Sequence, residues 1–218
     1  MDIIQLELLT NDTKGTESFY RDILNLKVVR KSTGEIEIVA GKTELTFKAV
    51  QNLKPVYHFA FNIPNNKLDE AFEWMQNKVE IMDITPGHKI ADFVNWNAKS
   101  FYFYDNNGNI LEFIARYDLN NQSEDLFNGS SILNVSEIGV ATDDVTTECD
   151  NLISKYNLPV FSKQPRLSNF TAIGDSNGLL ILSVASRHWY PTEKLAQKFY
   201  TGIVIKNDQH LDTITFHE

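Results

Sequence analysis

The sequence predicts an α+β fold built from a repeated unit of one strand, one helix and three further strands. Two observations support this prediction. Short segments alternate between apolar and polar residues, as half-buried strands do, and segments with apolar residues at helical spacing separate them. The same order of segments then recurs along the chain, which indicates an internal repeat. With 218 residues, 42% of them hydrophobic, the chain can bury a sizeable core.

The first unit is expected within residues 3–49. Residues 3–10 alternate and predict a half-buried strand. Residues 11–13 (Asn-Asp-Thr) can cap a helix that ends near Asn25, because their side chains accept hydrogen bonds from the first free backbone amides. The remaining strands of this unit are predicted at residues 26–30, 35–39 and 43–49.

The second unit begins with the alternating strand 56–63 and continues with a helix at residues 68–79. A hairpin closes the unit, because residues 105–108 (Asp-Asn-Asn-Gly) form a tight-turn sequence between two alternating segments. Glu112 projects from an otherwise largely apolar hairpin strand. Since an isolated ionised carboxylate is costly to bury, it should meet water, a cation or a metal. The other strands are predicted at 80–84, 101–104 and 109–116, with a long connection at 85–97.

A third unit follows a polar segment without periodicity. We therefore divide the chain into residues 1–117, a linker at 118–132, and a third unit with a C-terminal strand at 133–218. The elements predicted after the linker are a strand at 135–142, a helix at 143–156, strands at 160–162, 170–173 and 179–185, a short helix at 193–199 and a strand at 201–206.

Composition narrows the classes of partner. The formal net charge is −9 and the sequence contains no basic stripe interleaved with aromatic residues, so a nucleic-acid partner is not expected. The chain opens without a signal peptide, and its apolar runs are too short to span a membrane, so we expect a cytoplasmic protein with no membrane partner. The single cysteine, Cys149, excludes an internal disulfide and a thiolate cluster.

Three short stretches carry a family resemblance: residues 18–26 (SFYRDILNL), 58–61 (HFAF) and 103–112 (FYDNNGNILE). Together they resemble the vicinal oxygen chelate superfamily, which includes glyoxalase I, extradiol ring-cleavage dioxygenases, fosfomycin-resistance enzymes and bleomycin-binding proteins. The resemblance covers residues 1–117 well and 133–206 more weakly. It implies that the first two units pair into curved mixed sheets with a cup-shaped site, with the helices on the outer face.

The resemblance also implies a metal site in this cup. It places Gln5, His58 and Glu112 at ligand positions, and Glu44 at that of a fourth ligand. One imidazole, one or two carboxylates and an amide oxygen suit a divalent ion such as Zn, Ni, Fe, Co or Mn. Sequence spacing by itself does not support a shared site, and without the resemblance each residue is better explained as a polar group on a solvated sheet face.

Glutamine at position 5 is compatible with a glyoxalase I-like lyase or isomerase that acts on a small oxygenated substrate. In such a site the metal stabilises negative charge that develops on the substrate, and Glu112 or Glu44 would move the proton. Gln5 leaves a single histidine, which counts against extradiol ring cleavage, since those sites resemble a two-histidine, one-carboxylate set. A non-catalytic small-molecule binding protein of the bleomycin-resistance type is the other alternative.

Further residues are candidates for contact with the substrate. Tyr102 and Tyr104 share one face of the hairpin, and His88 and Trp96 lie in the long connection, where functional loops often occur.

The third unit is expected to have lost any site. In it, Glu137 corresponds to His58 and Leu182 corresponds to Glu112, and leucine cannot ligate a metal. An odd number of units also leaves one without a partner. This predicts either a homodimer or an irregular fourth half built from residues 201–206.

Overall fold

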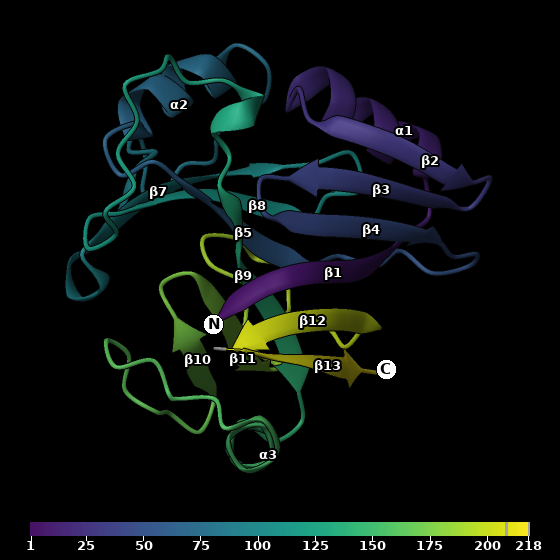
Figure 1. Ribbon diagram of the computed structural model, residues 1–218, viewed down its shortest axis with the longest axis vertical. Helices are drawn as coiled ribbons and strands as arrows, with labels where there is room; N and C mark the ends of the chain where they lie inside the picture. The colour runs from purple at the N-terminus through teal and green to yellow at the C-terminus, as the bar shows by residue number, and fades with distance from the viewer. Residues whose placement is uncertain (208, 218) are drawn as a thin grey trace.

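The computed structural model describes residues 1–207 and 209–217 and contains two large mixed sheets (Figure 1). The predicted α+β class and the repeated units are confirmed. The helices lie on the outside of the sheets, α1 and α2 at one end of the molecule and α3 at the other (Figure 1).

The first unit comprises the strand β1 (Asp2–Thr10), the helix α1 (Thr13–Ser18), which continues as a π-helical turn (Phe19–Ile23), and the strands β2 (Lys27–Ser32), β3 (Glu35–Ala40) and β4 (Thr43–Ala49). Asp12 caps α1, since its carboxylate accepts a hydrogen bond from the Gly15 amide at 2.9 Å. The predicted elements of this unit are therefore present, with the helix split into two kinds of turn.

The second unit comprises β5 (His58–Ile63), α2 (Leu68–Gln76), β6 (Ala91–Phe93), a 3₁₀ turn (Val94–Trp96), β7 (Ala98–Tyr104) and β8 (Ile110–Arg116). The strand predicted at 80–84 is wrong, because this segment makes only an isolated bridge between Ile81 and Phe103. The edge strand of the unit is β6, which lies inside the expected connection at 85–97.

The third unit comprises β9 (Asn134–Thr142), α3 (Val145–Tyr156), β10 (Phe170–Asp175) and β11 (Gly178–Val184). The strand predicted at 160–162 is reduced to one bridge between Val160 and Ile173. The segment 118–132 is largely irregular, with one 3₁₀ turn (Gly129–Ser131), and it is tied to the start of α2 by hydrogen bonds such as that from the Phe127 amide to Glu70 at 3.1 Å.

The end of the chain differs from the prediction. Residues 193–199 form no helix but an irregular segment in which Leu195 is bridged to His188. The predicted last strand is present as β12 (Thr201–Asn207), and a further strand, β13 (His210–Phe216), pairs with it. The hairpin of β12 and β13 continues the sheet next to β1, so the irregular fourth half is present within the chain.

The pairing of units differs from the expected arrangement. The six-stranded sheet has the order β13-β12-β1-β4-β3-β2, and the seven-stranded sheet has the order β10-β11-β9-β5-β8-β7-β6. The second unit thus shares a sheet with the third unit, through β5 and β9, while the first unit shares one with the terminal hairpin. The prediction that units one and two form one cup within residues 1–117 is wrong.

The core lies on the helix-facing side of the sheets. The seven-stranded sheet contributes Phe59 and Phe61 from β5, Phe113 from β8 and Ile138 from β9, all fully buried. Because side chains alternate along a strand, the residues between these point to the opposite face. That face carries the polar residues described below, and a smaller apolar cluster that includes Tyr102 and Trp189 lies over it.

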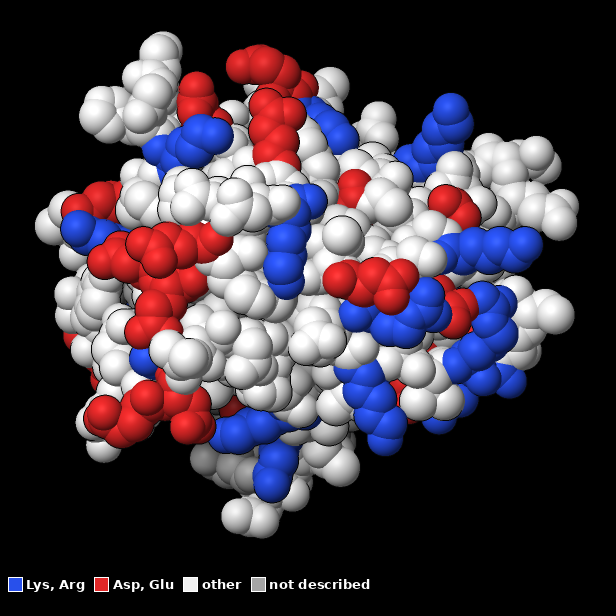
Figure 2. Space-filling view, turned by 90° about the horizontal axis from the view of Figure 1, so that it is seen from above, with Lys and Arg blue, Asp and Glu red and all other residues white. Residues whose placement is uncertain are grey.

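The outer surface carries both signs of charge. Figure 2 shows acidic and basic side chains interspersed on one face of the molecule, many of them next to a group of opposite sign. Arg21 on the turn after α1, for example, pairs with Glu17 at 2.9 Å. None of the helices among the described residues has the length and apolar character needed to cross a membrane.

Candidate metal centre

Three buried side chains of metal-ligating types converge on one face of the seven-stranded sheet. His58 begins β5, Glu112 lies in the middle of β8 and Glu137 lies in β9. One ligand-type atom from each residue lies within 4.8 Å of those of the other two. Their relative exposures are 7%, 2% and 4%, so the cluster is shielded from bulk water.

Strand order explains this convergence. β5 lies between β8 and β9, and its residue Ala60 is paired with Glu112 on one side and with Glu137 on the other. The small side chain of Ala60 leaves the space above it open, so that both carboxylates can lean over it. His58 lies two positions before Ala60 on the same strand and therefore points to the same face.

A β-bulge at Ser136 turns Glu137 toward this face. The register shifts between Ala60, which opposes Glu137, and Phe61, which opposes Val135, so Ser136 is the extra residue. As a consequence Val135 and Ile138 are both buried in the helix-facing core although they are three positions apart. In a regular strand such residues would lie on opposite faces, so the bulge has re-aimed the side chain of Glu137.

The His58 ring is held in one tautomer. Its Nδ1 lies 3.1 Å from the backbone carbonyl oxygen of Ile110, which can only accept a hydrogen bond, so Nδ1 carries the proton. Nε2 then has a free lone pair and lies 3.7 Å from a carboxylate oxygen of Glu112. Burial lowers the pKa of His58 to about 4, so the ring is neutral at physiological pH, as a metal ligand must be.

Glu112 is the carboxylate whose charge is least compensated. Burial and the neighbouring charge of Glu137 raise its pKa to about 8, although the hydroxyls of Ser100 and Tyr102 and the charge of Arg116 oppose the shift. Tyr102 is its cross-strand partner on β7 and is also buried. A carboxyl group with such a pKa can exchange a proton near neutral pH.

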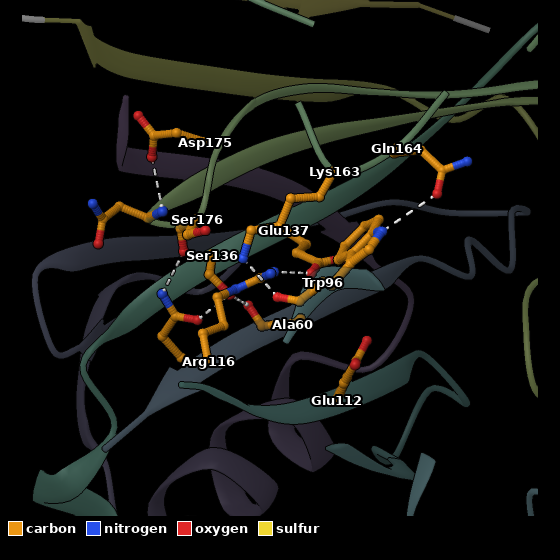
Figure 3. A network of polar contacts seen from close by, with 12 residues as sticks. Ala60, Trp96, Glu112, Arg116, Ser136, Glu137, Lys163, Gln164, Asp175 and Ser176 are labelled. Atoms are coloured by element: carbon orange, nitrogen blue, oxygen red, sulfur yellow. Dashed lines mark hydrogen bonds and ion pairs between the residues drawn. The ribbon is translucent and has the colours of Figure 1, made fainter. Parts of the chain in front are cut away.

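Glu137 is paired with a buried arginine. Arg116, at the end of β8, contacts the Glu137 carboxylate through one terminal nitrogen and donates through Nε to Asn62 at 3.2 Å (Figure 3). Burial raises the pKa of Glu137, and the guanidinium opposes that rise. Arg116 therefore favours the ionised form of Glu137 and fixes its orientation.

The cluster lies in a cavity of about 430 Å³ between the second and third units. Six aromatic side chains are among its lining residues: Phe93, Trp96, Tyr102, Phe170, Trp189 and Tyr190. Two of these rings lie next to the His58 ring, with centroid distances of 5.5 Å for Trp189 and 6.1 Å for Tyr102. A cavity of this size and lining suits a small molecule with a flat apolar part.

Trp96 joins the two units at one edge of the cavity (Figure 3). Its indole Nε1 donates to Gln164 at 3.3 Å, and its backbone carbonyl accepts from Lys163 at 2.8 Å. Its ring also meets Phe161 edge-on, with centroids 4.9 Å apart. The 3₁₀ turn after β6 and the segment before β10 are thereby held together over the sheet.

Two of the four predicted ligands are brought together and two are not. His58 and Glu112 belong to the cluster, whereas Gln5 and Glu44 lie in the six-stranded sheet, where β1 and β4 pair. Gln5 donates to Glu44 at 3.4 Å in an exposed position. Gln5 and Glu44 lie outside the cluster because the first unit pairs with the terminal hairpin, so the strands of the first unit do not reach the cavity.

The predicted substrate contacts are divided in the same way. Tyr102 and Trp96 line the cavity, whereas His88 and Tyr104 are not among its lining residues. His88 is exposed in a turn, where its backbone bonds to Thr85. The Tyr104 ring is partly exposed and covered by the Lys194 ammonium group at 4.2 Å.

The sequence predicts that the third unit has lost any site, but its residue Glu137 completes this cluster of side chains. The sequence contains one signal for this role of Glu137, which is its correspondence to His58 in the repeat. Regular alternation along the strand, counted from Val135, would instead predict that Glu137 points into the core. Leu182, the counterpart of Glu112, does lie in the core. Ile181 beside it lines the cavity, so β11 supplies no ligand atom here.

The donor set fits a divalent cation. An imidazole nitrogen with a free lone pair and two carboxylates suit Zn, Fe, Mn, Co or Ni. Protein nitrogen and oxygen ligands bind such ions at about 2.0–2.2 Å. Ligand atoms within 4.8 Å of one another can reach these distances through small movements of the side chains. The carboxylate of Glu137 can in addition retain its bond to Arg116, in the manner of an outer-shell partner that orients a ligand.

No protein-family model matches the sequence, and no curated protein matches it. Among solved structures, a "putative dioxygenase" from Bacillus subtilis subsp. subtilis str. 168 is similar, with a TM-score of 0.60 and 16% identity. The match covers 84% of this chain but 63% of that one, so this chain spans less than two thirds of that structure.

Shorter matches include a lactoylglutathione lyase from Agrobacterium tumefaciens (TM-score 0.42, 22% identity, 51% of this chain and 90% of that one). Another is a mutant of the fosfomycin resistance protein FosX from Listeria monocytogenes, complexed with Mn(II) and a dihydroxypropylphosphonic acid (TM-score 0.40, 22% identity, 50% of this chain and 86% of that one).

Proposed function

Since the chain has the vicinal oxygen chelate fold, as the sequence resemblance predicted, we propose that it is a metal-dependent enzyme acting on a small oxygenated substrate. The observation that carries the proposal is the convergence of His58, Glu112 and Glu137 in a cavity that six aromatic side chains help to line. Buried groups of like charge are costly, and a cation shared between them offsets that cost.

The three residues would hold the ion, and different neighbouring groups keep each of them in the form that binds a cation. His58 presents Nε2 because Ile110 fixes the tautomer, and Glu137 is kept ionised by Arg116. When bound, a divalent cation supplies Lewis-acid stabilisation of negative charge on substrate oxygens. Glu112 faces the cavity without a guanidinium partner, and we assign it the role of the group that moves a proton.

The donor set favours lyase or isomerase chemistry of the glyoxalase type over ring cleavage. Oxygen-activating ferrous sites commonly use two histidines and one carboxylate, whereas this cluster contains one histidine and two carboxylates. A second carboxylate provides a base close to the substrate, which a proton-transfer reaction needs. Ring cleavage is therefore the less supported activity.

Metal content tests the proposal directly. The protein should be purified without chelator, reconstituted with each of Zn, Ni, Fe, Co and Mn, and analysed by inductively coupled plasma mass spectrometry after gel filtration. We expect about one ion per chain in the wild type and strongly reduced retention in E112Q and E137Q, since each loses one ligand. E44Q is the matched control, because Glu44 lies in the other sheet, and it should retain the ion.

Two outcomes would contradict the proposal. One is the absence of a retained ion in the reconstituted wild type. The other is equal loss of metal in E44Q and E137Q, which would place the site elsewhere.

A non-catalytic binding role is the second candidate, and the aromatic wall of the cavity favours it. Six aromatic side chains surround a cavity large enough for a small molecule, which suits sequestration as well as catalysis. In that case a ligand should raise the melting temperature equally with and without EDTA. An increase that disappears with EDTA supports the metal-dependent enzyme instead.

A further inference from the structure

Arg187 is a cationic residue that lines the cavity. It lies three residues after β11 and lines the same cavity as the metal-ligand cluster. Among the described residues its guanidinium makes no hydrogen bond or ion pair, while its Cζ lies 4.5 Å from the centroid of the Phe170 ring. The other four arginines each pair with a carboxylate; they are Arg21, Arg30, Arg116 and Arg166.

The lack of a hydrogen-bond or ion-pair partner in the described part of the chain matters because Arg187 is partly removed from water. Burial lowers the pKa of Arg187, as expected for a cation that loses hydration without gaining a carboxylate. A guanidinium has five N–H donors in a planar fork that matches a carboxylate or phosphonate in two parallel hydrogen bonds. The guanidinium contacts the Phe170 ring, and its N–H donors, which bond to no other described residue, are available to a ligand.

The position of Arg187 is fixed by its backbone. Its amide donates to the Val184 carbonyl at 3.0 Å, and its carbonyl accepts from the Ala196 amide at 2.8 Å. Two residues later Trp189 packs next to the His58 ring. Arg187 lines the same cavity as His58, Glu112 and Glu137, so the guanidinium and the cluster share one cavity.

The charges of the cavity favour an anionic ligand once a metal is bound. Ionised Glu112 and Glu137 carry two negative charges, while Arg187 in the lining and Arg116, which is paired with Glu137, carry two positive ones. A divalent cation at the cluster therefore leaves a net positive cavity. An organic anion would offset part of that charge, and the guanidinium would orient it.

We propose that the cavity binds a small aromatic or similarly flat organic anion, with its carboxylate or phosphonate on Arg187 and its ring between the aromatic walls. This inference deepens the proposed function, on which it rests for the location of the reacting end near His58, Glu112 and Glu137. Arg187 is then the residue that selects anionic over neutral substrates.

Matched probes test the selection. Benzoate and phenylphosphonate should be compared with benzamide, which has nearly the same shape as benzoate but no charge, by isothermal titration calorimetry with metal-loaded and EDTA-treated protein. We expect the anions to bind at least tenfold more tightly than benzamide. In R187Q the preference for benzoate should fall by about tenfold or more, because the charge-assisted bonds are lost, while R187K should retain part of it.

The matched control is R166Q, since Arg166 is paired with Asp150 outside the cavity. It should leave benzoate binding unchanged. Equal affinities for benzoate and benzamide, no binding of either anion, or an R187Q protein with wild-type selectivity would overturn the inference. Circular dichroism of R187Q verifies that the fold is kept.

The two proposals fail separately. If the wild type retains no metal after reconstitution but still prefers anions in a way that depends on Arg187, the proposed metal-dependent enzyme is refuted and the anion site is upheld. A retained metal together with indifference between benzoate and benzamide would do the opposite.

Discussion

Replacing Arg116 with methionine should lower the free energy of unfolding, because it leaves the buried carboxylate of Glu137 without a cation. The Arg116 and Glu137 side chains are 1% and 6% exposed, so the pair is removed from water. Methionine keeps an apolar stem of similar length but removes the charge, which leaves Glu137 without its cation and Asn62 without the Nε donor. Breaking a buried pair by removal of one partner costs about 3–5 kcal/mol of unfolding free energy.

The loss should depend on pH in a defined direction. Burial already raises the pKa of Glu137, and loss of the guanidinium raises it further. The native state of R116M then holds a proton that the unfolded chain releases above its ordinary value near 4.5, so the stability of the variant falls as the pH rises. The deficit relative to wild type should be small near pH 5 and large near pH 8.

Urea denaturation followed by circular dichroism at both pH values measures this deficit. R21M is the control, because Arg21 forms an exposed ion pair, and it should change stability little at either pH. Saturation with a divalent metal should reduce the deficit of R116M, since the ion would compensate Glu137. A deficit at pH 8 below about 1 kcal/mol, or one equal at both pH values, would refute the assignment of a buried, charge-compensated Glu137.

Three further predictions concern the site and the frame around it. D105A should lower the unfolding free energy by about 2–4 kcal/mol, because buried Asp105 accepts hydrogen bonds from Asn107, Asn109 and Tyr20. Thermal or urea denaturation measures the loss, and wild-type stability would contradict this prediction. Metal affinity measured by competition with a chelator should rise by about tenfold per pH unit up to about pH 8, since Glu112 must lose its proton; a flat profile would refute the elevated pKa. G139A should displace Trp189, whose ring lies 2.7 Å from the added Cβ, and shift the tryptophan emission while weakening benzoate binding.

Local sequence patterns predicted the units of this fold because the helices, strands and turns of a unit depend mainly on residues that are close in sequence. The turn at residues 105–108 and the alternating strand that contains Glu112 are both present as expected. The partner of each unit depends on contacts that no local pattern encodes. β1 and β9 are both first strands with similar alternation, and only the tertiary structure decides that β9 lies next to β5.

The candidate site was predictable in part for the same reason. His58 and Glu112 belong to one unit, so the repeat placed them together. Gln5 and Glu44 were assigned on the assumption that units one and two share a cup. Glu137 was missed because a bulge leaves no periodic signal in the sequence, and because Leu182 at the position of Glu112 indicated that the third unit carries no site.

The extra residue in β9 has a consequence for how such a centre can arise. Without Ser136, Val135 and Glu137 would be adjacent, and ordinary alternation would still place Val135 in the phenylalanine-rich interior and Glu137 on the cavity face. The bulge therefore lets a strand with one additional residue keep both side chains on the faces that a regular, shorter strand would give them. An insertion at this point of β9 is absorbed locally, and the third oxygen donor of the centre is retained.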